Sequence, residues 1–377
     1  MDPRSIKECM QDPSGWSTKA QQLPVLRDGH GRVMQDLRVS ITDRCNFRCI
    51  YCLPETEEAA GFYRTRFDAL RHPLPAQSKP LTYQWKPKSE ILRFEEIERL
   101  VRVAARLGIT KVRVTGGEPL LRKDVPRLIS LLAAIPGIED IAMTTNGFLF
   151  PQQARALREA GLHRVSISLD ALDRERFQRI TGRDGLSEAL ASIDLAQECG
   201  FSPVKVNAVI IGGLNEQEIE PLACLAREKR LSLRFIEFMP LDSKHAWKRD
   251  LVVPGRMILE RLKARFDLVP VQIRSNPAET AQRWAFADGR GEIGIIAPVT
   301  QPFCGHCNRL RLTADGRLRT CLFSLEEHDL KPFLSPDSAD EVLAEHLVAL
   351  VARKEPGHRI GQSDFVQPDR TMSCIGG

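Results

Sequence analysis

The chain has 377 residues, and its 42% hydrophobic and 27% charged residues are ordinary for a folded globular protein. Lysine and arginine exceed aspartate and glutamate by only 54 to 49, and 6% of the residues are aromatic. So small a charge excess does not indicate nucleic-acid binding, and so few aromatic side chains disfavour a base-stacking surface. No run approaches the roughly 20 apolar residues that span a bilayer, so a membrane partner is not expected either.

Residues 1–34 are polar and irregular and are interpreted as an N-terminal arm. From Leu37 onward, short β-branched runs alternate with amphipathic stretches. Strands are expected at 37–42, 111–115, 141–145, 164–169, 205–211 and 232–239, and helices at 94–107, 124–135, 151–161, 186–200 and 216–229. Repeated units of this kind predict an α/β fold with right-handed crossovers and a mostly parallel sheet. Periodicity alone does not separate an open doubly wound sheet from a barrel.

Two segments depart from this alternation. Residues 56–88 are rich in proline and charge and lack a sustained period, which favours a disordered insertion or an ornament of this chain over a lid. Residues 246–300 change character again, with strands expected near 268–273 and 292–296. The expected organisation is therefore an arm over 1–34, a β/α domain over 35–245 and a C-terminal region over 246–377.

Three closely spaced cysteines follow the first expected strand: Cys45, Cys49 and Cys52. Three thiolates can hold three irons of a [4Fe–4S] cluster and leave the fourth iron open for a small molecule. No histidine lies near them in sequence, which disfavours zinc. Triplets of cysteines leave an odd thiol, and no apolar signal segment is evident at the N-terminus, so disulfides are disfavoured. A reducing compartment, the cytoplasm, is expected.

A second triplet lies near the other end of the chain: Cys304, Cys307 and Cys321. These three thiolates would again leave one iron of a cluster without a protein ligand. Because His306 could act as a fourth ligand, a zinc site is a minority alternative for this triplet. Two clusters that each have a vacant iron indicate chemistry more than structural support.

The residues between Cys307 and Cys321 alternate around an Ala-Asp-Gly sequence at 314–316, which predicts a β-hairpin. A two-residue turn would pair position 312 with 319, whereas a three-residue loop with Gly316 in the left-handed conformation pairs 309 with 321. Only the second register gathers five residues on one face: Cys307, Arg309, Arg311, Arg319 and Cys321. We therefore predict the three-residue loop.

Cationic residues recur at strand positions. Lys111 and Arg113 alternate with valines, so both cations share one side of their strand, and Lys205 repeats this pattern with Asn207. Arg38 precedes the first cysteine triplet. If these groups face a barrel lumen near its C-terminal mouth, they lie where such folds bind substrates and would suit a polyphosphate. Arg234 and Met239 are five positions apart, so on one continuous strand their side chains would lie on opposite faces. This predicts that Met239 lies past the end of the strand.

Several motifs carry a family resemblance that extends over nearly the whole chain from about Leu37. They are the first triplet, TGGEP at 115–119, TTNG at 144–147, SISLD at 166–170, RFIEFM at 234–239, the second triplet and the terminal Ile-Gly-Gly. Together they resemble the molybdenum cofactor biosynthesis protein A family, radical S-adenosylmethionine (SAM) lyases called GTP 3′,8-cyclases. The resemblance implies a partial (β/α)6 TIM-like barrel with a C-terminal iron–sulfur-binding extension, two [4Fe–4S] clusters and SAM. The 56–88 stretch departs from the family as an insertion.

The resemblance also implies a role for individual residues. SAM would be bound at the first cluster by Tyr51, Gly117, Ser168 and Met239. GTP would be bound at the second cluster by Arg38, Lys111, Arg113, Thr144, Lys205, Arg234, Arg309, Leu310 and Arg311. Gly376 and Gly377 would reach into the active site and act in catalysis. A 5′-deoxyadenosyl radical would take hydrogen from C3′ of GTP, and the ribose radical would attack guanine C8.

The implied product, (8S)-3′,8-cyclo-7,8-dihydroguanosine 5′-triphosphate, would pass to cyclic pyranopterin monophosphate synthase, and a reductant would supply electrons. The sequence does not decide whether the chain forms a homodimer. One alternative is a radical SAM enzyme with an auxiliary cluster that acts on a peptide or RNA, although such peptide enzymes tend to carry more cysteines after the barrel. A second is a non-enzymatic iron–sulfur or zinc sensor that binds nucleic acid, which would call for a basic recognition helix that we do not find in the sequence.

Overall fold

The structure is a computed structural model that describes residues 25–60, 80–242, 245, 247–271 and 277–376. Within these residues, twelve strands form one continuous curved sheet. Six of them are neighbours in chain order and run parallel: β1 (Asp36–Ser40), β2 (Lys111–Thr115), β3 (Asp140–Thr145), β4 (Arg164–Ser168), β5 (Lys205–Ile210) and β6 (Ser232–Glu237). Their bounds confirm the six expected strands to within two residues.

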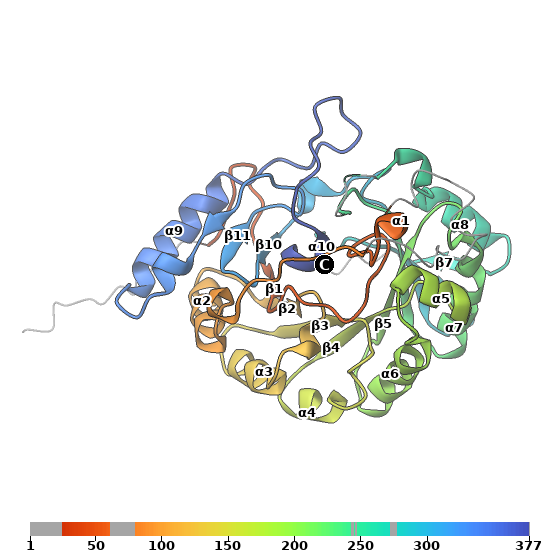
Figure 1. The fold of residues 1–377 in the computed structure, drawn as a ribbon, viewed down its shortest axis with the longest axis horizontal. Coiled ribbons are helices and arrows are strands. Elements are labelled where there is room, and N and C mark those ends of the chain that lie inside the picture. Colours follow the sequence, from red (N-terminus) through yellow and green to blue (C-terminus); the bar gives the residue numbers. More distant parts are fainter. Residues whose placement is uncertain (1–24, 61–79, 243–244, 246, 272–276, 377) are drawn as a thin grey trace, which may run out of the picture.

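The unbroken strand order decides between the two architectures that periodicity left open. A doubly wound sheet reverses its strand order at a switch point, whereas right-handed crossovers between strands in simple succession place every helix on the same face. Figure 1 shows this arrangement, with the helices outside the curved sheet. They are α2 (Phe94–Arg106), α3 (Val125–Ala133), α4 (Ala154–Glu159), α5 (Arg174–Thr181), α6 (Leu186–Glu198) and α7 (Ile219–Glu228). The fold is a partial (β/α)6 barrel, as expected.

The core lies between the sheet and these helices. On α2, Ile97, Leu100 and Val101 recur at helical spacing and are at most 1% exposed, and they face outward-pointing strand residues such as Val112 and Val114, which are fully buried. Helix α2 begins with a capping box, in which the Glu96 carboxylate accepts the Arg93 backbone N–H. Packing of this kind fixes the strands, so the polar side chains that alternate with the valines must face the lumen.

The C-terminal region extends the barrel sheet at both edges. At one edge β9 (Glu292–Ile296) lies parallel to β6, followed by antiparallel β8 (Gln282–Phe286) and β7 (Leu268–Pro270). At the other, β10 (Arg309–Leu312) lies parallel to β1, followed by antiparallel β11 (Arg317–Arg319) and β12 (His328–Asp329). The strand expected at 268–273 is shorter, and part of it lies outside the described residues.

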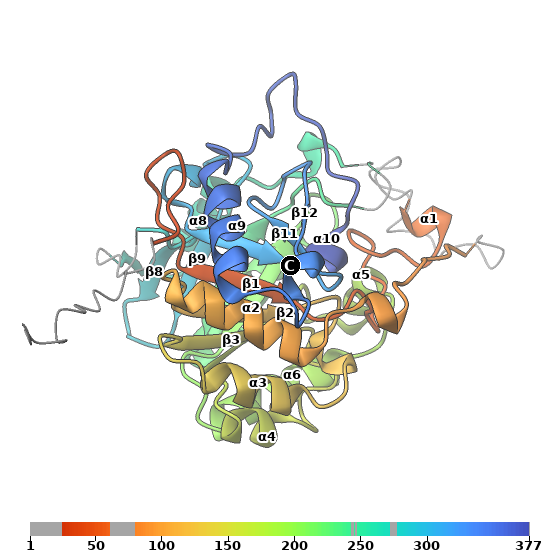
Figure 2. The same cartoon turned by 90° about the vertical axis from the view of Figure 1, so that its left-hand side faces the viewer.

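Three further helices complete the C-terminal region: α8 (Gly255–Lys263), α9 (Asp340–Ala352) and α10 (Met372–Ile375). Helix α9 packs beside α2, where the Asp340 carboxylate accepts hydrogen bonds from Arg99 and Arg102 (Figure 2). Helix α10 lies over the open centre of the barrel in Figure 1. No helix in the described ranges is both long enough and apolar enough to span a bilayer.

The described part of the N-terminal arm is a packed turn. Arg27 and Val33 form a β-bridge, and Leu26 and Met34 are fully buried. The Arg32 guanidinium donates to the carbonyl oxygens of Cys304 and Pro356 at 2.8 and 2.9 Å. Residues 25–34 thus brace the loop of the second cysteine triplet, which the irregular sequence did not reveal, while residues 1–24 lie outside the described part.

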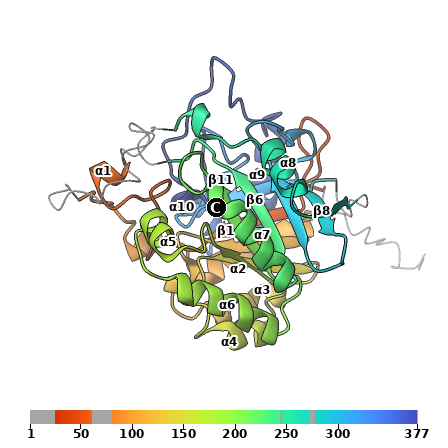
Figure 3. The ribbon, with the colours of Figure 1, turned by 90° about the vertical axis from the view of Figure 1, so that its right-hand side faces the viewer.

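The two ends of the 56–88 segment are anchored to the loop of the first triplet. Thr56 forms a bridge with Pro80, and the Tyr83 hydroxyl donates to the Pro54 carbonyl at 2.7 Å. The short helix α1 (Glu57–Ala60) stands at the margin of the molecule in Figure 3. Residues 61–79 lie outside the described part, so the interpretation of this segment as an insertion stays a prediction.

Candidate active site

A single cavity of about 360 Å³ is lined by both cysteine triplets. Its wall includes the last residues of several parallel strands, among them Thr115 on β2, Ser168 on β4 and Glu237 on β6. It therefore lies at the C-terminal mouth of the barrel, where barrels of this kind bind their substrates. Residues 45 and 321, far apart in sequence, reach this mouth because β10 pairs directly with β1.

The first triplet lies on the loop after β1, which is docked on the end of α5. The backbone N–H groups of Arg48 and Ile50 donate to the carbonyls of Thr181 and Ile180 at 2.7 and 2.9 Å. Burial, reinforced by the neighbouring charges, raises the pKa of the Cys45 thiol to about 11 and that of Cys52 to about 12. Burial and the other two thiols raise the pKa of Cys49 well above its ordinary value. Such thiols ionise only when a bound metal supplies compensating positive charge.

Gly116 and Gly117 directly follow β2, beside this loop. A Cβ atom at Gly117 would lie 2.3 Å from the Arg44 carbonyl oxygen, and one at Gly116 would lie 2.8 Å from that of Thr42. The Gly117 N–H donates to the Thr42 carbonyl at 2.7 Å. Both glycines line the cavity, but the close approach that demands glycine here is to the backbone leading into the cysteine loop. The contact of Gly117 with SAM stays a prediction.

The four residues assigned to SAM by resemblance all line the cavity: Tyr51, Gly117, Ser168 and Met239. Met239 lies beyond β6, which ends at Glu237, so the out-of-phase prediction is confirmed. The Tyr51 hydroxyl donates to the Asp170 carboxylate, whose other oxygen accepts the Val209 N–H at 2.8 Å. Burial raises the pKa of Asp170 to about 6.

Two buried carboxylates at the cavity had no role in the sequence interpretation. Glu118 accepts the Thr145 hydroxyl at 2.7 Å and the Asn146 N–H at 2.8 Å, and burial raises its pKa to about 7. Glu237 is fully buried and accepts the N–H groups of Gly255 and Val299 at 2.7 and 2.9 Å. For Glu237, the available signal was an acidic residue at the end of a largely buried strand, where a buried charge needs donors to satisfy it. Glu118 lies in the loop after β2.

The hairpin at the second triplet has the predicted register. Arg311 pairs with Arg319 and Leu312 with Leu318, and Gly316 has a φ of 81° after a three-residue loop. Cys304, Cys307 and Cys321 all line the cavity, whereas His306 is exposed and is not part of its lining. Arg319 shares the face of its partner Arg311, but its guanidinium donates to the Glu327 carboxylate at 2.5 Å and does not line the cavity.

A buried lysine, Lys354, contacts the backbone next to the second triplet. The Lys354 ammonium is held by the backbone carbonyls of Arg309 and Thr320, which lie close to Cys307 and Cys321 in sequence. Burial opposes ionisation of the Cys307 thiol, but Arg309 and Lys354 outweigh it and lower the pKa to about 7. Cys321 of the same triplet differs, because burial raises its pKa although Lys354 opposes the shift.

Six of the nine residues assigned to GTP line the cavity: Arg38, Arg113, Thr144, Arg234, Arg309 and Arg311. Lys111 and Lys205 lie deeper, each two residues before a lining residue of the same strand, Arg113 and Asn207. The Lys111 ammonium is paired with Asp36 at 2.5 Å. The Leu310 side chain is buried in the main hydrophobic core, so only its backbone is left to contact a ligand.

The lumen is rich in positive charge, although Lys111 is paired with Asp36 and Arg234 lies 3.9 Å from Glu279. Burial lowers the pKa of Arg38 and of Arg113 to about 10, and burial together with Arg234, Arg164 and Arg113 lowers that of Lys205 to about 6. The Nε atoms of Arg38 and Arg234 and the Oδ1 atom of Asn207 are buried without a hydrogen-bond partner in the described residues. Buried charges and polar atoms of this kind are costly unless a ligand satisfies them. A polyanion would accept hydrogen bonds from the two arginine Nε–H groups, whereas the Asn207 Oδ1 atom needs a donor such as a hydroxyl.

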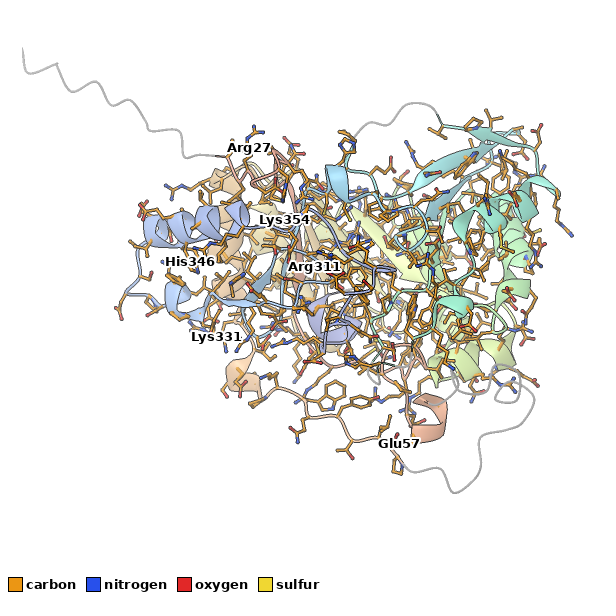
Figure 4. The ribbon with its side chains drawn as sticks, turned by 90° about the horizontal axis from the view of Figure 1, so that it is seen from above. Arg27, Glu57, Arg311, Lys331, His346 and Lys354 are labelled. Atoms are coloured by element: carbon orange, nitrogen blue, oxygen red, sulfur yellow. The ribbon has the colours of Figure 1, made fainter. Side chains whose placement is uncertain are left out.

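The C-terminal tail enters the cavity mouth. Met372 and Ser373 line the cavity, Ile375 is fully buried, and the Arg311 guanidinium donates to the Gly376 carbonyl. Gly376 has a φ of 75°, and a Cβ there would lie 2.7 Å from the Thr115 methyl group. Figure 4 places Arg311 at the centre of the molecule. Gly377 lies outside the described residues, so the assignment of the glycine pair stays a prediction.

Comparison with known proteins gives the family. Residues 39–226 match the radical SAM superfamily, and residues 231–360 match the family described as Molybdenum Cofactor Synthesis C. The GTP 3′,8-cyclase of Rhodopirellula baltica is 43% identical to this chain over 97% of it and 95% of that protein. The chain belongs to the GTP 3′,8-cyclase family. A second member, from Corynebacterium glutamicum, is 44% identical over 94% of this chain and 89% of that protein.

A solved structure supports the fold of this cyclase family member. SuiB of Streptococcus suis, crystallised with S-adenosylmethionine, matches with a TM-score of 0.56 over 85% of this chain and 68% of that chain. The two are 13% identical, so the likeness concerns the fold alone.

Both cysteine triplets fit the cofactors of this family, two [4Fe–4S] clusters and SAM. Six free thiols line one cavity in two groups of three, and each group leaves one iron of a cluster without a protein ligand. In the described part of the chain, no three His, Cys, Asp or Glu side chains converge as a single metal ion requires. The arrangement thus differs from the closed tetrahedral site of the zinc alternative.

Proposed function

We propose that the chain converts GTP into (8S)-3′,8-cyclo-7,8-dihydroguanosine 5′-triphosphate, a step of molybdenum cofactor biosynthesis. The relatives named GTP 3′,8-cyclase support this reaction. One observation carries the proposal: a single cavity is lined by five arginines and by two cysteine triplets, each of which would leave one iron of a cluster without a protein ligand. A radical source and a polyphosphate site that share one cavity suit chemistry on a bound nucleotide.

Cys45, Cys49 and Cys52 would hold the SAM cluster, with Tyr51, Gly117, Ser168 and Met239 around SAM. When bound, this cluster supplies the electron that cleaves SAM to a 5′-deoxyadenosyl radical. The chain's own part is to position SAM and to keep water away. The Asp170 carboxylate fixes the Tyr51 hydroxyl, and Met372 and Ser373 of α10 line the same cavity.

Cys304, Cys307 and Cys321 would hold the second cluster, which binds the base of GTP. The triphosphate would be bound by Arg38, Arg113, Arg234, Arg309 and Arg311, with Lys111 and Lys205 adding charge from below and Thr144 and the Leu310 backbone adding polar contacts. Planar guanidiniums suit phosphate because they donate bidentately. Holding both ends of the nucleotide fixes its ribose between them, and such orientation is the gain that proximity gives an intramolecular attack.

The remaining proposals concern the tail and the partners. Gly376 and Gly377 would act inside the assembled site, which the position of Gly376 beside Thr115 supports. The product would pass to cyclic pyranopterin monophosphate synthase, and a reductant would supply electrons in the cytoplasm. A homodimer is compatible with this scheme but is not needed for it, because one chain supplies all lining residues described above.

Anaerobic turnover tests the proposal. The reconstituted protein, with about eight irons per chain, is incubated with SAM, a reductant and GTP, and the products are separated by mass spectrometry. We expect 5′-deoxyadenosine together with a cyclised GTP. Active SAM cleavage that leaves GTP unchanged would contradict the proposal and favour a peptide or RNA substrate. Zinc without iron would favour the non-enzymatic sensor.

A further inference from the structure

The C-terminal tail is attached to the β10–β11 hairpin at two points. At the tip of the hairpin, the Arg370 guanidinium forms two hydrogen bonds with the Asp315 carboxylate, from Nη1 at 2.9 Å and from Nη2 at 2.8 Å. Its Nε atom lies 3.0 Å from the Glu327 carboxylate. On β10, the Arg311 guanidinium donates to the Gly376 carbonyl at the other end of the tail.

The Arg370 contact is shielded from solvent and well supported. The side chains of Asp315, Glu327 and Arg370 are 6%, 13% and 25% exposed. Asp315 also accepts the Thr313 hydroxyl at 2.6 Å, and Glu327 is paired with Arg319, which is 2% exposed. A bidentate pair with restrained partners is far stronger than an ordinary surface ion pair. This attachment therefore fixes where the tail leaves the hairpin.

The Arg311 contact serves two competing groups. Arg311 faces the cavity beside the second triplet, where its charge is proposed to bind the triphosphate of GTP. A phosphate is a stronger acceptor than a backbone carbonyl, so a bound nucleotide weakens the hold of Arg311 on Gly376. Arg370 is not among the residues that line the cavity, and its hold on the tail is not shared with the substrate.

We propose that Arg370 is a positioning residue for cyclisation, which keeps the tail docked on the hairpin of the second triplet while Arg311 is engaged by GTP. This inference rests on the proposed function. Asp315 lies between the strands that lead from Cys307 to Cys321, and five residues lie between Arg370 and Gly376. The hairpin that carries Arg309 and Arg311, the arginines proposed to bind GTP, thereby also sets the position of the glycine tail.

The test replaces Arg370 by glutamine in the full-length, cluster-loaded protein. At saturating GTP, R370Q should lower the ratio of cyclised GTP to 5′-deoxyadenosine by on the order of tenfold or more, because a small displacement of a positioned group is costly. SAM cleavage and the KM for GTP should change less than about threefold. D315N should act in the same way, and R370K, which keeps the charge but loses the bidentate geometry, should recover part of the ratio.

Arg359→Gln is the matched control. Arg359 forms an ion pair with Asp364 in the same C-terminal stretch, but the two side chains are 61% and 52% exposed and do not contact the hairpin. R359Q should couple SAM cleavage to cyclisation as wild type does.

A second readout does not depend on turnover. Cys374 lies in α10 and is partly buried, so alkylation of its thiol, followed by mass spectrometry with Cys199 as internal reference, reports whether the tail is docked. In R370Q, GTP should accelerate alkylation of Cys374 several-fold, whereas in wild type GTP should leave it slow. The reason is that GTP weakens the Arg311 contact, the attachment to the hairpin described above that the variant retains.

Two outcomes would overturn the inference. One is a normal product ratio with Cys374 still protected in R370Q, which would make the ion pair dispensable. The other is loss of four irons per chain or of GTP binding, which would make Arg370 a support of the hairpin alone. Failure of the proposed function would look different, since the wild-type chain would then form no cyclised GTP although its tail stays docked.

Discussion

Lys205 lies in the barrel lumen, 8% exposed, among the guanidiniums of Arg113, Arg164 and Arg234. Burial and these cations together lower its pKa to about 6, so the amine of the free protein is neutral above about pH 6. Because the same lysine is charged in an unfolded chain, it costs stability below its ordinary pKa of 10.5, and this cost shrinks as the pH rises from about 6 toward that value.

We expect binding of GTP to be coupled to proton uptake. The triphosphate brings negative charge to the lumen, which raises the pKa of Lys205 and favours its charged form. Calorimetric titration at pH 7.5 in buffers of different ionisation enthalpy should show uptake approaching about one proton per GTP. K205M should abolish most of it, whereas the control K331M should not, because Lys331 lies on the surface and donates to the Glu90 carbonyl (Figure 4). Heats that are identical in all buffers would contradict this role.

Single residues show where inference from sequence succeeds and where it stops. Alternation correctly predicted that Arg113 shares a side with Lys111, since strand geometry fixes the side on which a residue lies. It did not predict how far each side chain reaches, and Lys111 lies below the cavity, paired with Asp36. Arg319 has the predicted register, yet its guanidinium turns to Glu327, a partner from a later strand connection that no local pattern could specify.

At the scale of elements, local patterns were sufficient where local physics decides the structure. The hairpin loop was predicted from the need for a left-handed glycine and a common face, and Gly316 and the pairing of Arg311 with Arg319 confirm it. Helix α5 was not predicted, because only Phe177, Ile180 and Thr181 of its eight residues are buried and its periodic signal is weak. The antiparallel strand β8 was also missed, since its pairing with β9 depends on contacts across a turn.

Replacement of residues 61–79 by a short Gly-Ser linker tests the insertion. Thr56 and Pro80 are already paired, so a few flexible residues can join Ala60 to Pro80, and the Tyr83 contact to Pro54 is kept. SAM cleavage and cyclisation should stay within about threefold of wild type, because long surface insertions are tolerated well. A total loss of turnover with both clusters intact would identify the segment as a lid.

At the scale of the whole molecule, strands of the C-terminal region pair with both edge strands of the barrel. The sequence predicted six strands of a barrel and two cysteine triplets, but it contained no local signal that β10 would pair with β1 and β9 with β6. Those pairings carry the second triplet from the far end of the chain to the mouth that holds the first. Long-range strand pairing depends on the complete set of packed faces, which is why only the family resemblance indicated this assembly.

Serine variants of the two triplets should therefore differ in one assay. Changing Cys45, Cys49 or Cys52 to serine should abolish 5′-deoxyadenosine formation, because that triplet is proposed to hold the SAM cluster. Changing Cys304, Cys307 or Cys321 should weaken GTP binding and abolish cyclisation while some slow SAM cleavage remains. Iron content, expected to fall from about eight to about four per chain, shows that only one cluster is lost. Normal cyclisation in the second set would mean that the C-terminal triplet has a structural role, with zinc as its metal.

The transfer of hydrogen between the two substrates tests most directly that they share one cavity. GTP with deuterium at C3′ is incubated anaerobically with the reconstituted wild-type protein, SAM and a reductant, and the 5′-deoxyadenosine is analysed by mass spectrometry. A single cavity lined by both triplets predicts that 5′-deoxyadenosine gains one deuterium as the cyclised nucleotide forms. Unlabelled 5′-deoxyadenosine beside unchanged GTP would contradict it.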